Sequence, residues 1–90
     1  MGIAAVPITA TVGTSSIQIL SANSKRSGLS VVNVSRNTIS LAFGHPAILN
    51  GGITLLSGAA FGMDQFLFTT QAMNAIATAP GSILSVQEFD

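Results

Sequence analysis

Short runs in which apolar and polar residues alternate dominate this chain. In residues 38–43, Ile39, Leu41 and Phe43 alternate with smaller or more polar residues, a period of two that is typical of a strand with one buried face. No segment keeps the spacing of an amphipathic helix beyond about two turns. The pattern therefore predicts an all-β protein.

Turn signals made of Gly, Asn, Ser and Pro separate these runs, for example Asn50-Gly51-Gly52 and Pro80-Gly81. They recur at intervals of roughly 8–12 residues, as in small antiparallel sandwiches and barrels. We expect one β domain with eight short strands, and its strand order stays open. The expected strands are residues 3–12, 17–20, 29–35, 38–43, 53–56, 63–70 (with Phe66 and Phe68 on one face), 75–78 and 83–89.

The N-terminal segment, residues 1–16, has two interpretations beside the β domain of residues 17–90. It carries no charge, and Pro7 favours an extended edge position. Alternation at Ala4, Val6 and Ile8 gives it one apolar face, which suits an extended arm that adds to the sheet of a neighbouring subunit. The alternative is the first strand of the chain's own sandwich.

Charged residues are scarce in this chain, and this affects what we expect of its surface. Charged residues make up 7% of the chain, against about 25% in ordinary domains, and the formal net charge is zero. A soluble monomer usually keeps its net charge away from zero, so we expect neighbouring subunits to cover part of this surface. Three basic residues are too few for appreciable nucleic-acid affinity, and no run of about 20 apolar residues predicts a membrane helix. The charged residues are Lys25, Arg26, Arg36, Asp64, Glu88 and Asp90.

The sequence offers no convincing catalytic, cofactor or metal site. There is no cysteine and one histidine, His45, so zinc would need an unusual set of carboxylate ligands. No G-x-S-x-G motif marks a nucleophilic serine. We therefore expect no enzyme and no cofactor, and we expect His45 to bond to backbone or to a neighbouring subunit. We expect the basic pair Lys25-Arg26 to form an ion pair with Glu88 or Asp90, either across a subunit boundary or within the fold. Such pairs contribute roughly 0–1 kcal/mol when they are exposed.

Residues 19–44 read I-L-S-A-N-S-K-R-S-G-L-S-V-V-N-V-S-R-N-T-I-S-L-A-F-G. This run resembles small β-structured virion proteins of tailed bacteriophages, in which an Ala-Asn turn and a basic pair precede a Leu-x-Val strand. The ending I-L-S-V-Q-E-F of residues 83–89 is similar to theirs.

The resemblance implies a capsid decoration (cement) or head-fibre-base protein, made in the host cytoplasm and located on the capsid surface. Its partners would be other copies of itself, in a homotrimer, and the major capsid protein. A ligand- or carbohydrate-binding module of a phage fibre is the alternative, although Trp and Tyr are absent. The expected subunit or capsid contact residues are Val6, Ile8, Lys25, Arg26, Arg36 and Glu88.

Overall fold

The computed structural model describes residues 5–63 and 69–89, and this part of the chain contains eight strands and no helix. Each strand is short and is bounded by turns, as the sequence predicts. The strands are β1 (Ala5–Val12), β2 (Ile17–Leu20), β3 (Gly28–Asn33), β4 (Ile39–Phe43), β5 (Ile53–Leu55), β6 (Ala60–Met63), β7 (Met73–Ala77) and β8 (Ser82–Phe89).

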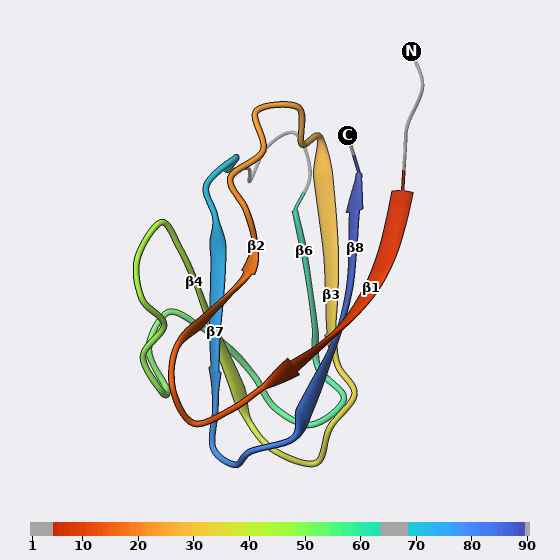
Figure 1. Ribbon diagram of the computed structural model, residues 1–90. Coiled ribbons are helices and arrows are strands. Elements are labelled where there is room, and N and C mark those ends of the chain that lie inside the picture. The colour runs from red at the N-terminus through yellow and green to blue at the C-terminus, as the bar shows by residue number, and fades with distance from the viewer. Residues whose placement is uncertain (1–4, 64–68, 90) are drawn as a thin grey trace.

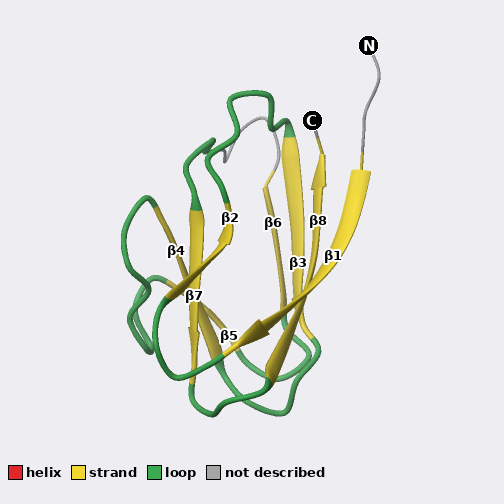
Figure 2. Ribbon diagram, viewed as in Figure 1, coloured by secondary structure: helices red, strands yellow, loops and turns green. Residues whose placement is uncertain are grey.

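The strands form two antiparallel sheets packed face to face (Figures 1 and 2). Sheet one has the order β1-β8-β3-β6, and sheet two has the order β2-β7-β4-β5. The prediction of an all-β sandwich is therefore confirmed. Strands that are distant in the sequence are neighbours in both sheets. The alternation pattern did not predict this strand order.

The core lies between the two sheets and is built from the side chains that face inward from each sheet. On β7 the alternation is strict, because Met73, Ala75 and Ala77 are fully buried while Asn74 and Ile76 between them are half-buried. Phe43 and Phe61 pack at the edge of the core from opposite sheets, with ring centroids 6.2 Å apart. The other fully buried large apolar side chains in the described residues are Val12, Val31, Ile39, Leu41, Leu84 and Val86.

The sixth strand lies earlier in the chain than the sequence predicts. Pairing with β3 places Phe61 opposite Val31, so β6 covers Ala60–Met63, a segment whose small residues were expected to form a turn. The partner strand decides the pairing here, since Ala60 and Gly62 give little local preference for a strand. Most of the expected strand 63–70, including Phe66 and Phe68, lies outside the described residues.

Residues Ala5–Val12 form the first strand of the chain's own sandwich. β1 pairs along its whole length with β8, from Ala5 opposite Phe89 to Val12 opposite Ser82. The carbonyl of Gly13 then accepts a hydrogen bond from the backbone N–H of Ala77 at 2.8 Å. Ala77 lies on β7, so the chain reaches sheet two at this point. Ile8 packs against this subunit's own core, so the apolar face expected of an arm is already partly used.

Candidate interaction surfaces

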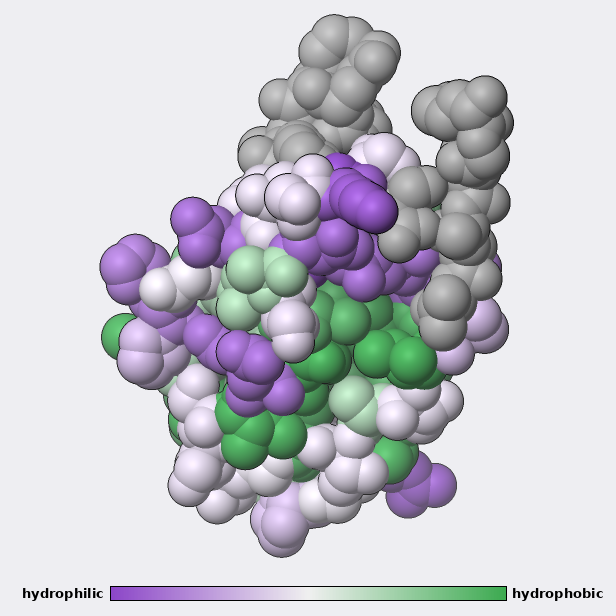
Figure 3. Space-filling view, turned by 45° about the horizontal axis from the view of Figure 1, so that its top comes forward, coloured by the Kyte–Doolittle hydropathy of each residue, from purple (hydrophilic) through white to green (hydrophobic). Residues whose placement is uncertain are grey.

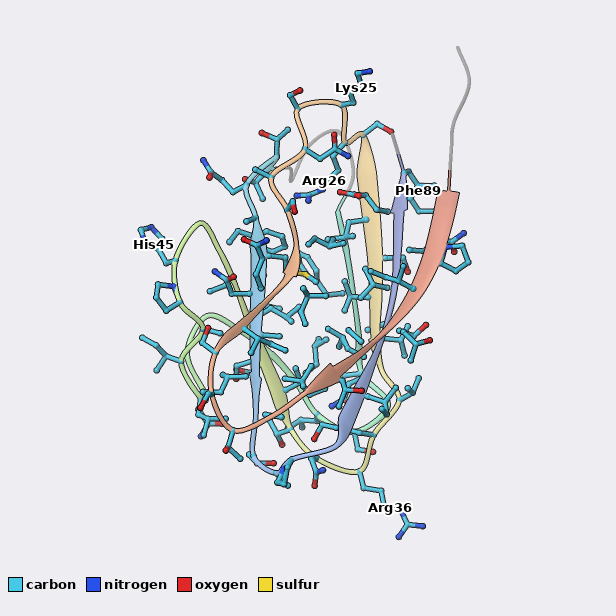
Figure 4. The ribbon with its side chains drawn as sticks, in the orientation of Figure 1. Lys25, Arg26, Arg36, His45 and Phe89 are labelled. Atoms are coloured by element: carbon cyan, nitrogen blue, oxygen red, sulfur yellow. The ribbon has the colours of Figure 1, made fainter. Side chains whose placement is uncertain are left out.

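A buried arginine occupies one end of the sandwich. Arg26 lies in the loop between β2 and β3, and only 3% of its surface is exposed. Its Nε donates to Glu88 Oε2 at 2.6 Å, Nη1 donates to the carbonyls of Thr69 and Gln71 at 3.1 and 2.8 Å, and Nη2 donates to the carbonyl of Ser21 at 3.1 Å. Figure 4 shows Arg26 turned inward between the two sheets.

These four bonds join both sheets. Ser21 directly follows β2 and Gln71 lies two residues before β7, and both of these strands belong to sheet two. Glu88 lies on β8 in sheet one. The expected pairing with Glu88 is confirmed, within one chain. The pair is buried on the arginine side, because three carbonyls and the carboxylate enclose the planar guanidinium, a geometry that suits Arg better than Lys. Arg26 is therefore unavailable as a contact with another subunit.

The remaining expected contact residues are spread over the molecule. Lys25 is exposed beside the buried arginine, whereas Arg36 is exposed at the opposite end (Figure 4). Val6 lies on β1 opposite Glu88 in the register, and Ile8 is half-buried. The structure thus joins Arg26 with Glu88 and separates both from Arg36.

His45 lies outside any candidate metal cluster in the described part of the chain. It is exposed in the loop after β4, where its backbone carbonyl accepts a hydrogen bond from Asn74 Nδ2 at 2.5 Å. Within residues 5–63 and 69–89, no three His, Cys, Asp or Glu side chains lie close enough together to hold a metal ion. This bond is made by the His45 backbone, so a bond of its imidazole to backbone or to a neighbouring subunit stays a prediction.

Sequence reasoning placed Pro7 at an edge position but did not identify which backbone groups of β1 face outward. The N–H of Val34 donates to the carbonyl of Ile83 at 3.2 Å. Because bonding alternates along an antiparallel ladder, Ser85 and Gln87 also direct their backbone groups toward β3. The residues between them on β8 bond to β1. The β1 residues opposite Phe89, Gln87, Ser85 and Ile83 therefore direct their backbone groups outward, away from β8. These outward-facing residues are Ala5, Pro7, Thr9 and Thr11.

The other three sheet edges in the described part of the chain are shorter or interrupted. β6 contains four residues, of which Ala60 and Gly62 face outward by the same alternation, since Asn33 N–H donates to Ala59 O at 2.9 Å. β2 is interrupted by a bulge between Gln18 and Leu20, and β5 has three residues. Shortness and bulges are common protections of edge strands. β1 is the longest edge, and Pro7, which has no N–H to donate, is the feature of its described residues that limits pairing.

The surface near these edges is poor in charge and partly apolar. Figure 3 shows hydrophobic groups gathered in the middle of one face, with hydrophilic groups around them. Exposed apolar side chains also lie in the loops, where Ile48 is 71% exposed and Leu56 is 64% exposed. β1 itself carries no charged residue. The molecule therefore has uncharged surface available for contact with a partner.

A scan of the described residues for helices able to cross a membrane found none. No protein family and no curated protein matches the sequence. Among solved structures, the fold is similar to a chain from work titled "Bacillus endospore appendages form a novel family of disulfide-linked pili", with a TM-score of 0.57 and 15% identity. The match covers 98% of this chain and 84% of that chain. At this identity, the likeness establishes a shared β-sandwich fold.

Proposed function

We propose that this chain is a structural subunit that associates with copies of itself and performs no chemical reaction. The observation that carries the proposal is the long, uncharged free edge of β1, because an unpaired strand edge is a template for pairing with another chain. Scarcity of charge supports it, since exposed charge keeps monomers apart. The solved structure of similar fold comes from work on disulfide-linked pili, which also supports a structural role.

A more specific proposal concerns the kind of assembly that the subunit forms and where that assembly is located. The resemblance of residues 19–44 and 83–89 to small phage virion proteins supports a decoration protein on the capsid surface, which forms a homotrimer and has the major capsid protein as partner. A polymer of subunits is the second candidate, favoured by the pilus likeness. Since this chain has no cysteine, such a polymer would be held by noncovalent contacts rather than by disulfides.

One experiment separates these candidates. The mass of the purified protein is measured by light scattering after size-exclusion chromatography, from micromolar to hundreds of micromolar. A trimer mass supports the decoration protein, and masses that grow with concentration support the polymer. A stable monomer over the whole range would refute self-association. Cosedimentation with capsids of a phage whose genome encodes the chain then tests attachment, and failure to bind would remove the capsid role.

A further inference from the structure

We propose that the free edge of β1 pairs antiparallel with β1 of a second copy, about a two-fold axis that passes beside Ile8. The inference rests on the proposed self-association and names the strand and register through which it occurs. In this register Ala5 lies opposite Thr11 of the second copy and Pro7 lies opposite its Thr9. Sheet one of each copy then continues into the other as a single sheet.

The backbone groups of β1 favour this register over its neighbours. Four outward residues would exchange about eight hydrogen bonds in an antiparallel pair, but Pro7 has no N–H to donate. Pairing Ala5 with Thr11 leaves about six bonds, because each Pro7 carbonyl still accepts from the Thr9 N–H of the other copy. Alignment of Pro7 with Pro7, or of Thr9 with Thr9, leaves only about four bonds. Proline therefore selects the alignment.

Among the strands of residues 5–63 and 69–89, a second β1 is also the best partner for this edge. β6 turns only Ala60 and Gly62 outward, which allows about four bonds with β1. β2 and β5 offer fewer, because of the bulge at Gln18/Leu20 and the three-residue length. An isologous contact needs a surface that is complementary to itself, and the alternating donors and acceptors of β1 meet this requirement.

Side chains on both faces of the joined strands are compatible with the contact. Ile8 faces the core and is half-buried, and the two-fold axis brings it beside Ile8 of the second copy, where a pair of β-branched side chains is favourable. Thr9 and Thr11 are exposed on the outer face, and no charged residue lies on β1. Two copies can approach along this edge without like charges directly opposite each other.

Proline substitution at Thr9 tests the pairing, because it removes an N–H that faces outward and has no partner within the subunit. We expect the dissociation constant of the dimer, measured by sedimentation equilibrium, to rise about 10- to 100-fold, since one bond per copy is lost. Thr9→Val keeps the N–H and is the matched control, with little change expected. Pro7→Thr restores the missing donor and should tighten association by a similar factor. Far-ultraviolet circular dichroism checks that every variant is folded.

Amide hydrogen exchange provides a second readout that is independent of mutation. The Thr9 and Thr11 amides should exchange more slowly as the protein concentration rises, whereas those of Ala60 and Gly62 should not change. If the wild type assembles but folded Thr9→Pro assembles equally well, the pairing is wrong and the proposed function stands. If protection appears at Ala60 and Gly62 instead, the contact involves β6. If the wild type stays monomeric, the proposed function and this inference both fail. An isologous contact joins only two copies, so a trimer would need another contact elsewhere on the subunit.

Discussion

Replacing Arg26 with alanine measures how strongly the guanidinium stabilises the closed end of the sandwich. The substitution leaves the carbonyls of Ser21, Thr69 and Gln71 and the Glu88 carboxylate without their donor. Removing one member of a buried ion pair costs about 3–5 kcal/mol, and water can reach Glu88, whose side chain is 22% exposed. We therefore expect the free energy of unfolding to fall by about 4 kcal/mol, a large share of the roughly 5–15 kcal/mol typical of a domain.

The assay is urea unfolding followed by far-ultraviolet circular dichroism, because the chain has no Trp or Tyr for fluorescence. With a slope of about 1 kcal/mol per molar urea, the midpoint should fall by about 4 M. Glu88→Gln should cost less, about 1–2 kcal/mol, because Arg26 keeps its three carbonyl acceptors. Lys25→Ala, beside it but exposed, is the control and should stay within about 0.5 kcal/mol. If Arg26→Ala unfolds within about 1 kcal/mol of the wild type, the guanidinium does not join the sheets as described.

Four further predictions concern stability and function, and the first three are checked with the same unfolding assay. Asn33→Ala should cost about 2–4 kcal/mol, because buried Asn33 donates to the Asn37 and Leu55 carbonyls and accepts from Ser35; an effect below about 1 kcal/mol would contradict this. Ser40→Ala should cost about 1–2 kcal/mol, since its hydroxyl accepts from Asn50 N–H and bonds Thr54, while exposed Ser30→Ala should be neutral. Deleting residues 2–16 removes β1 and the buried Val12, so we expect an unfolded chain, and a folded β-rich product would favour the arm instead. His45→Asn should leave stability and oligomer mass unchanged, and the loss of any measurable activity would reveal a missed site.

Much of the fold could be predicted from the sequence, because apolar and polar residues alternate along strands that bury one face. Ile39 and Leu41 are buried as the pattern predicts, and the predicted turn at Pro80-Gly81 contains Gly81 at a φ of 74°, a conformation that glycine adopts readily. The sixth strand was misplaced because Ala60 and Gly62 have no strand preference of their own. Only the pairing with β3, a long-range interaction, makes them a strand.

The site was less predictable, for two physical reasons. Sequence identified both members of the Arg26–Glu88 pair, but the buried position of Arg26 depends on carbonyls of residues 21, 69 and 71, which converge only in the folded chain. The free edge of β1 consists of backbone groups, which every residue has. Which of them face outward follows from the strand order, and a single sequence does not encode that order in any local signal.

The position of β8 in sheet one has a consequence for how the chain folds during synthesis. β8 lies between β1 and β3 and is the last of the eight strands to be made. On the ribosome, β1 therefore waits unpaired while the six intervening strands emerge, and neither neighbour of β8 can bond to it before then. Folds built from such distant pairings form slowly and expose strand edges while they wait. The same uncharged edge that suits β1 to assembly thus makes the nascent chain prone to premature association.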